Sequence, residues 1–537
     1  MKDHGQSKKK KRLAVPIMIQ GTASSAGKSL ITAALCRIFT QDGYKAAPFK
    51  AQNMALNSGV TPDGLEIGRA QITQARAANI PIDSRLNPVL LKPTGEKESQ
   101  VIVNGKVFAR MSAREYFKFR RSLLPTIAKS YYSLARDYDI IVIEGAGSPA
   151  EINLKKDDIA NMGIARLVNA PVLLAGDIDK GGVFASLYGT VSLLPRSERK
   201  LIKGLLINKF RGDLKLLKGG LRQIKELTGI PVLGVIPYIE NLTIEDEDSV
   251  SDLVSNTLAS QKFSAVNPSE RGNRLHVSAA RLPYMSNFTD MNALSRLPFV
   301  DVTFFGSEQE YKECEAVYGK TDLLILPGTK NTMRALKTLK KTGLFDFIRS
   351  IEQTTPVIGI CGGYQLMAEV IKDEHAREDG KHASIEKGLA LLETCVIFKK
   401  KKTRCNTITV IPQMEGFFSF LSGLPVKGYE IHSGQTLFFP YGYRKFAAKG
   451  NSFGTYLHGF FESRLALTAI IGALFSAKNL PAPPIPESSV NIEKEYDRLA
   501  DTVRASLNLD AIYDILKERG LKIKPRSSLI VNRARRF

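Results

Sequence analysis

One cysteine of this chain lies in a sequence context that suits nucleophilic catalysis. Cys361 follows the apolar run TTPVIGI and precedes two glycines and a helical pattern. A nucleophile at such a turn projects from the end of a strand, and its small neighbours leave room for a substrate. The N–H groups of the following helix favour a thiolate and an oxyanion. A buried structural cysteine at a strand end is the alternative interpretation.

A cysteine nucleophile needs a base, and His458 is the candidate. It ends the strand-like segment FGTYLHG, almost a hundred residues after the cysteine. Among the other histidines, His4 lies in a charged tail, and His375 and His382 lie in a polar stretch. His432, in GYEIHSG, is the rival, with a structural or supporting role as the alternative to catalysis.

A second group of residues suits phosphate binding. The apolar run VPIMIQ leads into the loop GTASSAGKS, which is followed by the helical pattern LITAALCRIF. The loop has one residue more between its glycines than the usual phosphate-binding pattern, but its glycines, Gly-Lys-Ser and helix N-terminus are present. We therefore expect the nucleotide to bind at Gly21, Thr22, Gly27, Lys28 and Ser29. A Gly/Ser-rich turn is the alternative.

Carboxylates at the ends of later strands are candidate magnesium ligands. Glu144 ends the apolar segment YDIIVIE, and with Ser29 it forms the predicted Mg²⁺ site, because Mg²⁺ prefers hard oxygen ligands and few protein carboxylates. Asp177 and Asp179 end another such segment, where they suit the metal, the acceptor or a solvated turn equally well. Lys50 is predicted to contact phosphate, with a solvated surface lysine as the alternative.

The elements that must hold these residues alternate along the chain. Strand-length apolar runs separated by helical stretches predict parallel sheets whose ligands bind at the carboxyl ends of the strands. The runs are VPIMI, KAAPF, IIVIEG, APVLLAG, KGLLINKF and IPVLGVIPY, and the pattern restarts at LHVSAARLPY, VDVTFFG, DLLILPG and TPVIGICGG. The sequence thus predicts two α/β domains. We place a basic disordered tail at 1–12, an ATP-binding domain at 13–255, a second domain at 274–470 and a helical basic extension at 471–537.

Composition excludes several classes of protein. The chain has 537 residues, 43% of them hydrophobic, which fits a globular protein of two or three domains. We find no membrane-length apolar stretch and no signal-peptide core, which predicts a cytoplasmic protein without a membrane partner. Five scattered cysteines without a Cys-x-x-Cys pair argue against a zinc site or a disulfide framework.

The net charge of +23 raises the question of nucleic-acid binding. About half of this excess lies in the two ends of the chain, where basic runs are usually solvated tails. The remainder suits anionic small substrates at least as well, and no recognised nucleic-acid module is present. We therefore predict no nucleic-acid partner. The lysine run 399–402 is interpreted as a charged hairpin or loop insertion.

Together these segments resemble the cobyric acid synthases, the glutamine-dependent amidases of cobalamin biosynthesis, over nearly all of residues 14–500. GTASSAGKS is similar to the phosphate loop of dethiobiotin synthetases, which has the same additional residue. The other segments that carry the resemblance are FKAQNMALNS, EIGRAQ, NPVLLKP, SQVIVNG, EGAGSPAEIN, NMGIA, DIDKGGVFASLYGT, INKFRGD, LPYMSNFTD, LPGTKNT, GICGGYQLM, GYEIHSG and GTYLHG.

The resemblance implies a dethiobiotin-synthetase-like P-loop domain followed by a class I glutamine amidotransferase-like α/β domain. Cys361 would attack the side-chain amide of glutamine, His458 would transfer the proton, and backbone N–H groups near Gly328 and Gly362 would hold the oxyanion. ATP and Mg²⁺ would activate a carboxylate as an acyl phosphate, which ammonia converts to an amide. The implied acceptor is a corrinoid polycarboxylate, adenosylcobyrinic acid a,c-diamide, amidated at its b, d, e and g carboxylates.

The sequence departs from related patterns in two places. Many class I amidotransferases have a His-x-Glu pair, but His458 is followed by Gly-Phe, so we expect a Cys–His dyad, with Glu430 or Glu462 as substitutes for the orienting carboxylate. The dethiobiotin-synthetase-like fold commonly has an Asp after its second strand, where this chain reads Lys50-Ala-Gln-Asn53. The second metal ligand therefore stays open.

Other functions account for less of the sequence. Cobyrinic acid a,c-diamide synthases share the two-domain plan but lack the FKAQNM and DIDKGGVFASLYGT segments. A partition-type P-loop ATPase leaves Cys361 and His458 without a role. A dethiobiotin-type ligase needs no glutaminase domain, and a catalytically silent C-terminal half does not account for an intact Cys and His.

Overall fold

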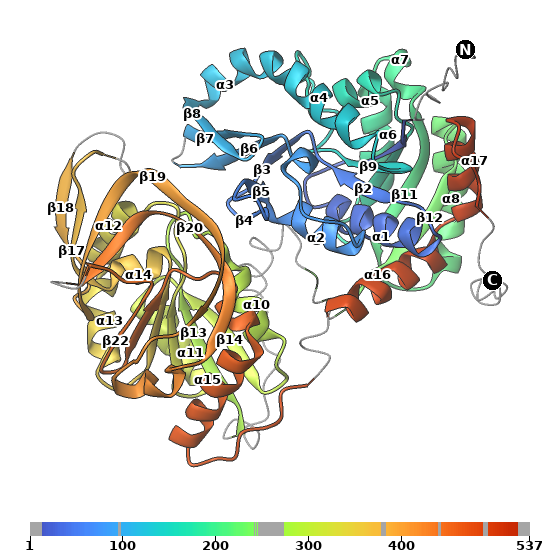
Figure 1. Cartoon of the computed structure of the whole chain (residues 1–537). Helices are drawn as coiled ribbons and strands as arrows, with labels where there is room; N and C mark the ends of the chain where they lie inside the picture. The colour runs from blue at the N-terminus through green and yellow to red at the C-terminus, as the bar shows by residue number, and fades with distance from the viewer. Residues whose placement is uncertain are drawn as a thin grey trace, which may run out of the picture.

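The computed structural model forms two lobes, coloured blue to green and yellow to orange in Figure 1. It describes residues 13–94, 98–240, 242, 244, 273–376, 378, 383–438, 442–486 and 492–524. The predicted tail at 1–12 lies outside the described residues, as does the chain between 245 and 272, where the predicted domain boundary falls.

The first lobe is built on a six-stranded sheet in the order β12-β11-β10-β1-β9-β2, and all of its strand pairs are parallel. Each of the six predicted apolar runs forms one of these strands. Their bounds are β1 (Val15–Gly21), β2 (Ala46–Phe49), β9 (Ile140–Glu144), β10 (Val172–Asp177), β11 (Ile202–Phe210) and β12 (Val232–Pro237).

Successive residues of the central strands enter different cores, because side chains alternate between the two faces of a sheet. In β1, Ile17 and Ile19 pack in one core and Met18 in the other, and β9 divides its isoleucines in the same way. A sheet covered by helices on both faces explains why these strands read as continuous apolar runs.

Helices cover both faces of this sheet, and two smaller sheets extend its rim (Figure 1). The helices are α1 (Lys28–Gln41), α2 (Arg69–Ala77), α3 (Ala113–Phe119), α4 (Leu124–Leu134), α5 (Met162–Leu167), α6 (Val183–Leu193), α7 (Arg196–Arg199) and α8 (Leu214–Thr228). The smaller sheets contain β3 (Gln52–Met54), β6 (Val89–Pro93), β7 (Glu98–Val103) and β8 (Lys106–Ser112), and separately β4 (Ser58–Val60) and β5 (Glu66–Gly68).

The second lobe has its own six-stranded sheet in the order β14-β13-β15-β16-β23-β22, parallel except for the β22–β23 hairpin. The four apolar runs predicted for this half form β13 (Leu275–Ala280), β14 (Val300–Phe305), β15 (Leu323–Leu326) and β16 (Val357–Ile360). The sheet ends with β22 (Phe446–Lys449) and β23 (Ser452–Thr455), and the helices of this lobe are α10 (Asn292–Ser295), α11 (Glu308–Tyr318), α12 (Thr332–Thr342), α13 (Leu344–Glu352), α14 (Gly362–Leu366) and α15 (Arg464–Ala477).

A second sheet of this lobe lies toward the first lobe. Its strands are β17 (Ala368–Asp373), β18 (Ser384–Lys387), β19 (Leu392–Val410), β20 (Pro425–Phe438) and β21 (Gly442–Tyr443). The lysine run 399–402 is part of β19, at an irregularity in its pairing with β20. Lys402 Nζ lies 2.9 Å from the carboxylate of Glu66 in the first lobe, so the run includes a contact between the domains.

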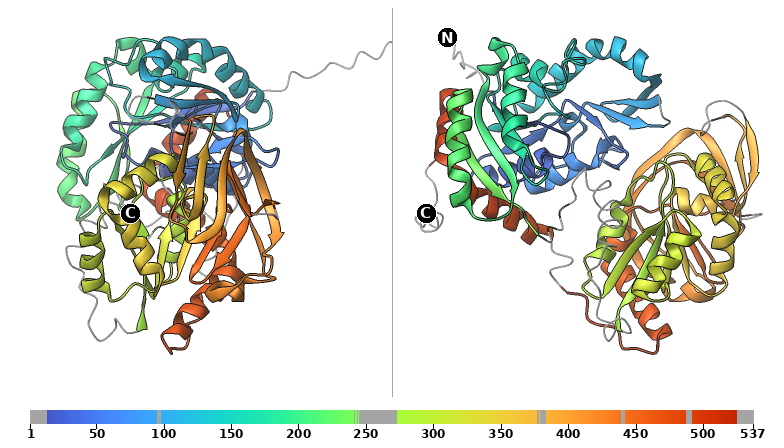
Figure 2. Two further views of the ribbon diagram at one scale, coloured as in Figure 1. Left: turned by 90° about the vertical axis from the view of Figure 1, so that its left-hand side faces the viewer. Right: turned by 180° about the vertical axis from the view of Figure 1, so that it is seen from behind.

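The C-terminal helices return to the first lobe, where they are drawn in red beside the blue and green elements (Figures 1 and 2). Helix α15 continues through residue 471, the start predicted for the extension, and belongs to the second lobe. Helices α16 (Ile492–Ser506) and α17 (Leu509–Glu518) then pack against α1. Tyr513 donates a hydrogen bond to Asp42 at 2.5 Å, and Arg504 pairs with the same carboxylate at 2.9 Å.

Over the part of the chain that the structure describes, no helix is both long and apolar enough to span a membrane.

Candidate active sites

The phosphate-binding loop connects β1 to α1, as the sequence predicts. Gly27 caps α1 with a φ of 84°, and a side chain there would meet the Asn208 amide at 2.0 Å, so only glycine fits. At the start of the loop, the backbone N–H of Thr22 bonds to Ala175 O at 2.9 Å, and a Cβ on Gly21 would lie 2.9 Å from Ala23 O. The loop therefore directs its backbone from a fixed strand end into the N-terminus of α1, the arrangement that binds phosphate.

Lys28 is the first residue of α1 and is buried within the loop. Its ammonium group donates to the carbonyls of Ala23 and Ser24, each at 2.8 Å. The loop thus holds a positive charge beside the helix N-terminus, where both would attract the phosphates of a nucleotide.

Glu144 is the centre of a buried polar cluster at the carboxyl end of β9. Its Oε1 accepts from Ser29 Oγ at 2.7 Å and from Lys50 Nζ at 2.9 Å, and its Oε2 accepts from Gln74 Nε2 at 2.5 Å. Burial would raise the pKa of Glu144, but the charge of Lys50 and the hydrogen bonds from Gln74, Lys50 and Ser29 hold it below its usual value.

The structure thus brings together the three residues predicted for this site, Ser29, Lys50 and Glu144. A serine hydroxyl and an ionised carboxylate side by side are hard oxygen ligands that fit Mg²⁺. Gln74 was not predicted as part of the site. It lies in EIGRAQITQ, next to a segment that carries the family resemblance, and only the fold brings it to Glu144.

The two other candidate carboxylates have different partners. Asp177 pairs with Lys209 at 3.0 Å, and Asp179 lies 3.3 Å from Arg211. The same turn reaches the phosphate loop through Lys180, which donates to the hydroxyl of Ser25. The turn therefore borders the phosphate loop, but these contacts do not place its carboxylates at the Glu144 cluster.

Cys361 lies on a sharp turn between β16 and α14. Its φ of 50° and ψ of −103° are strained for a residue with a side chain. Hydrogen bonds hold the turn on both sides, because its N–H donates to Thr455 O at 2.8 Å and its carbonyl accepts from the Gln365 N–H at 3.0 Å. This is the geometry of a nucleophile elbow, in which the thiol stands at the N-terminus of the following helix.

A second loop lies directly against this elbow. A Cβ on Gly362 would lie 2.7 Å from the backbone nitrogen of Thr329, and one on Gly328 would lie 2.8 Å from Ser286 O and 3.2 Å from Cε1 of His458. Glycine is therefore required at both positions for the two backbones and the histidine to approach one another. The predicted oxyanion-binding residues, Gly328 and Gly362, are thus next to the predicted nucleophile and base.

His458 is buried and is oriented by a carboxylate that is not among the residues predicted from the sequence. Asp290 Oδ2 lies 2.8 Å from His458 Nδ1, and its Oδ1 accepts from the Gly459 N–H at 2.7 Å. The other ring nitrogen, Nε2, is buried without a hydrogen-bond partner among the described residues. The expectation of a dyad without an orienting carboxylate is thereby corrected, because Asp290 occupies that position.

The charge on His458 is stabilised by its neighbours. Burial alone would lower the pKa of His458, but the negative charges of Asp290 and Cys361, with the Asp290 hydrogen bond, raise it to about 10. The imidazole is therefore protonated at neutral pH. A buried cysteine and a protonated histidine beside candidate oxyanion-binding N–H groups are suited to acyl transfer.

The rival residues have other partners. His432 Nδ1 lies 2.6 Å from Gly434 O, its Nε2 lies 3.2 Å from Glu430, and its ring stacks on Tyr456. Glu430 also accepts from Thr407 and pairs with Lys445 at 2.7 Å. Burial would raise the pKa of Glu430, but hydrogen bonds from His432 and Lys445 lower it to about 2. Both residues belong to a separate polar network on β20.

Glu462, the other proposed substitute for the orienting carboxylate, faces the other domain. It pairs with Arg69 of α2 at 2.9 Å, while its backbone N–H donates to Gly459 O at 3.0 Å. The carboxylate of Asp290, not that of Glu462, therefore orients the His458 ring.

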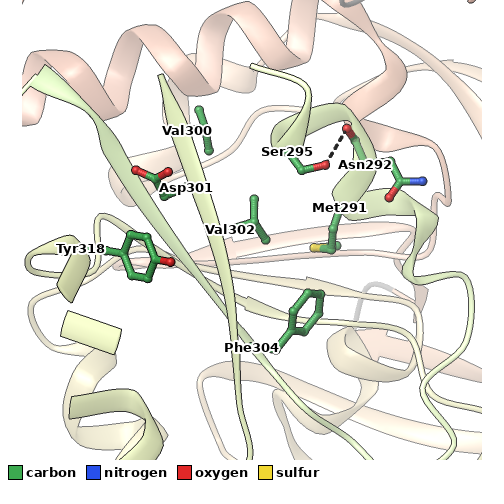
Figure 3. A pocket seen from close by; sticks show the side chains of 8 residues that line it. All are labelled: Met291, Asn292, Ser295, Val300, Asp301, Val302, Phe304 and Tyr318. Carbon is green, nitrogen blue, oxygen red and sulfur yellow. Dashed lines mark hydrogen bonds between the residues drawn. The ribbon is translucent and has the colours of Figure 1, made fainter. Parts of the chain in front are cut away.

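A pocket at the outer edge of the second lobe contains none of these residues (Figure 3). It lies between β14 and α10 and has a volume of about 130 Å³. Sites for drug-sized ligands usually enclose several hundred Å³. This pocket is therefore small, and the candidate catalytic and phosphate-binding residues lie outside it, at the strand ends described above.

Each half of the chain matches a known protein family. Residues 17–250 match the CobQ/CobB/MinD/ParA nucleotide binding domain, and residues 276–466 match the CobB/CobQ-like glutamine amidotransferase domain. These two matches coincide with the two lobes and with the two groups of candidate residues.

Relatives of known name match both domains at once. The chain is 46% identical to a cobyric acid synthase of Ruminiclostridium cellulolyticum, with 94% of this chain and 98% of the relative covered. A cobyric acid synthase of Lachnoclostridium phytofermentans is 45% identical, and one of Salmonella arizonae is 44% identical, with 94% of this chain covered in each case and 100% and 98% of the relatives. Among solved structures, PurLQS from Thermotoga maritima aligns with 13% identity over 38% of this chain and 98% of its own, and the TM-score of 0.26 is too low to indicate a shared fold.

Proposed function

The chain belongs to the cobyric acid synthase family, and from this premise we propose that it amidates the b, d, e and g carboxylates of adenosylcobyrinic acid a,c-diamide. The product would be adenosylcobyric acid. An amidoligase of this family contains a nucleotide-binding domain and a glutamine amidotransferase domain. The observation that carries the proposal is the 43–46% identity to cobyric acid synthases across both domains.

In the amidotransferase domain, the Cys361 thiolate attacks the side-chain amide carbon of glutamine. The backbone N–H groups near Gly328 and Gly362 stabilise the oxyanion, and His458 protonates the leaving nitrogen, so ammonia departs and a thioester remains. Water activated by the now neutral His458 then releases glutamate. Asp290 holds the imidazole in the orientation that presents Nε2 to the reacting atoms.

Replacing Asp290 by asparagine is expected to reduce glutamine-dependent kcat by about 10²- to 10⁴-fold, because the carboxylate that orients and charges His458 is lost. The wild-type imidazolium persists up to a pH of about 10, so the pH profile of Cys361 alkylation should contain no step from His458 between pH ~6 and ~9. Without the Asp290 charge, burial lowers the His458 pKa, so the alkylation profile of Asp290→Asn should gain a step where His458 loses its proton.

The measurement is iodoacetamide labelling at several pH values, read at the Cys361 peptide by mass spectrometry. Ammonia-dependent amidation is the control, since the Asp290→Asn enzyme should retain it. A labelling profile that matches the wild type would show that Asp290 does not set the charge of His458.

In the nucleotide-binding domain, the phosphate loop and Lys28 bind the phosphates of ATP. Ser29 and Glu144 would hold Mg²⁺, which neutralises phosphate charge during transfer. Lys50 lies beside Glu144 and would supply a second positive charge to a phosphate or to the acyl phosphate. Transfer gives an acyl phosphate and ADP, and attack by ammonia then forms the amide and releases phosphate.

The test is to supply glutamine, ATP, Mg²⁺ and cobyrinic acid a,c-diamide or its adenosylated form, and to follow the corrinoid by mass spectrometry. Successive mass changes that each match carboxyl-to-amide conversion support the proposal. A parallel reaction supplies unamidated cobyrinic acid, and activity only there, stopping after two amides, would instead indicate a cobyrinic acid a,c-diamide synthase. ATP hydrolysis without any corrinoid product would favour a partition-type ATPase.

A further inference from the structure

Two residues of the nucleotide-binding domain contact the segments that carry the glutaminase base. Resting on the proposed function, we propose that Asn57 and Arg69 position the Asp290–His458 pair from across the domain interface. We further propose that helix α2 links this pair to Glu144 of the nucleotide site. The glutaminase site would then depend on the neighbouring domain for its active geometry.

The first contact is a reciprocal pair of asparagines. The N–H of Asn287 donates to Asn57 Oδ1 at 2.7 Å, and the N–H of Ser58 donates to Asn287 Oδ1 at 3.0 Å. All three residues are buried, and Asn287 has a left-handed φ of 53°. The carbonyl of Asn287 accepts the Asp290 N–H at 3.1 Å. The other domain therefore holds both the N–H and the side chain of the residue that begins the turn with the orienting carboxylate.

The second contact comes from Arg69, the first residue of α2. Its guanidinium pairs with Glu462 at 2.9 Å and lies 5.8 Å from the ring centre of Tyr429. The Tyr429 ring stacks on His458 with ring centres 5.2 Å apart, and the backbones of the two residues exchange hydrogen bonds at 3.1 and 2.9 Å. Arg69 therefore helps to hold Tyr429, whose ring covers one face of the His458 imidazole.

The Asn57 and Arg69 contacts are linked through the backbone of the nucleotide-binding domain. The backbone N–H of Arg69 donates to the carbonyl of Asn57 at 3.2 Å. The side chain of Arg69 is nearly inaccessible to solvent, with 7% of it exposed. A well-buried arginine that reaches another domain has few alternative rotamers. It therefore fixes the distance between the two segments as well as the position of its charge.

Helix α2 also reaches the nucleotide site. Gln74 is five residues from Arg69, and its amide donates to Glu144 Oε2 at 2.5 Å and to Ser29 O at 3.3 Å. Eight of the nine residues of α2 are buried, so the helix must move as one body. Ligands that take up the oxygens of Glu144 and Ser29 compete with Gln74, and any shift of α2 is carried to Arg69.

The test compares Arg69→Met and Asn57→Ala with the matched control Arg76→Met, which alters an exposed arginine of the same helix. We expect kcat for glutamine-dependent amidation to fall about 10- to 100-fold in the first two, because a misplaced base slows chemistry, while the KM for glutamine changes little. Ammonia-dependent amidation should stay within about twofold of the wild type, since the base has no part in it. Arg69→Lys keeps the positive charge and Asn57→Asp keeps the acceptor oxygen, so these two variants should retain more of the glutamine-dependent kcat.

The link to Glu144 is tested separately by the rate of Cys361 alkylation with and without ATP·Mg²⁺. We expect nucleotide to change this rate about fivefold or more in the wild type and in Arg76→Met, and to have little effect in Arg69→Met. An unchanged rate in the wild type would contradict the link.

The outcomes separate this proposal from the proposed function. If the wild type releases glutamate and Arg69→Met and Asn57→Ala keep its glutamine-dependent rate, the positioning role is wrong and the function stands. If both variants lose glutamine- and ammonia-dependent activity equally, the residues serve the other domain or its folding, and the positioning role is again wrong. A wild type that releases no glutamate under any corrinoid condition would overturn the proposed function itself.

Discussion

Replacing Cys361 by serine is expected to lower glutamine-dependent amidation by about 10³-fold or more, because the thiolate that attacks the amide is lost. The P-loop domain is untouched, so amidation with ammonium chloride should proceed within about twofold of the wild-type rate. The measurement is corrinoid mass with either nitrogen source, at equal ATP and Mg²⁺.

Cys395→Ser is the matched control for this prediction. Cys395 is a buried cysteine of the same domain, on β19, and it has no assigned part in catalysis. It should leave both nitrogen sources equally usable. If Cys361→Ser retained glutamine use, the assigned nucleophile would be wrong, and a loss of both activities would point to a folding defect.

Replacing Lys28 by methionine should lower amidation with both nitrogen sources, unlike the replacement of Cys361. Removing the ammonium group from the phosphate loop is expected to reduce amidation by about 10²-fold or more with glutamine and with ammonia alike, because phosphoryl transfer depends on positioned positive charge. The Cys361 site is unchanged, so alkylation of its thiol should continue. The measurement is ADP and corrinoid amide formation with each nitrogen source.

Lys215→Met provides the comparison, because it removes an exposed lysine from α8 of the same domain. Amidation should be unaffected in that variant. A Lys28→Met enzyme with undiminished ADP formation would contradict the assignment of the loop, whatever its effect on glutamine use.

Much of this architecture follows from local sequence. The apolar runs predict the strands of both parallel sheets because a strand covered on both faces has no polar side to interrupt the pattern. The phosphate loop and the cysteine elbow were found for a similar reason, since each is a contiguous stretch with glycines at positions where only glycine fits, such as Gly27.

The parts that were missed depend on contacts between distant segments. Asp290 precedes His458 by 168 residues and reaches it only through folding. No spacing rule connects them, although Asp290 ends LPYMSNFTD, one of the segments that carry the family resemblance. Gln74 reaches Glu144 in the same way, from a helix whose mostly polar sequence does not reveal that eight of its nine residues are buried.

The C-terminal helices show a further limit. Their helical character can be predicted, but Leu499, Val503 and Ile512 face a core whose other side is α1, more than 450 residues earlier. An apolar stripe on a helix indicates that the helix packs against another element, but it does not identify that element. The same holds for Lys402, whose partner Glu66 lies in the other domain.

The most direct measurement of the two-site account counts ADP, glutamate and corrinoid amide in a single reaction. If one domain activates the carboxylate and the other supplies the nitrogen, each new amide should appear with one ADP and one glutamate, from the first amidation to the last. Amide formation without matching glutamate, or from glutamine without ADP, would contradict the account.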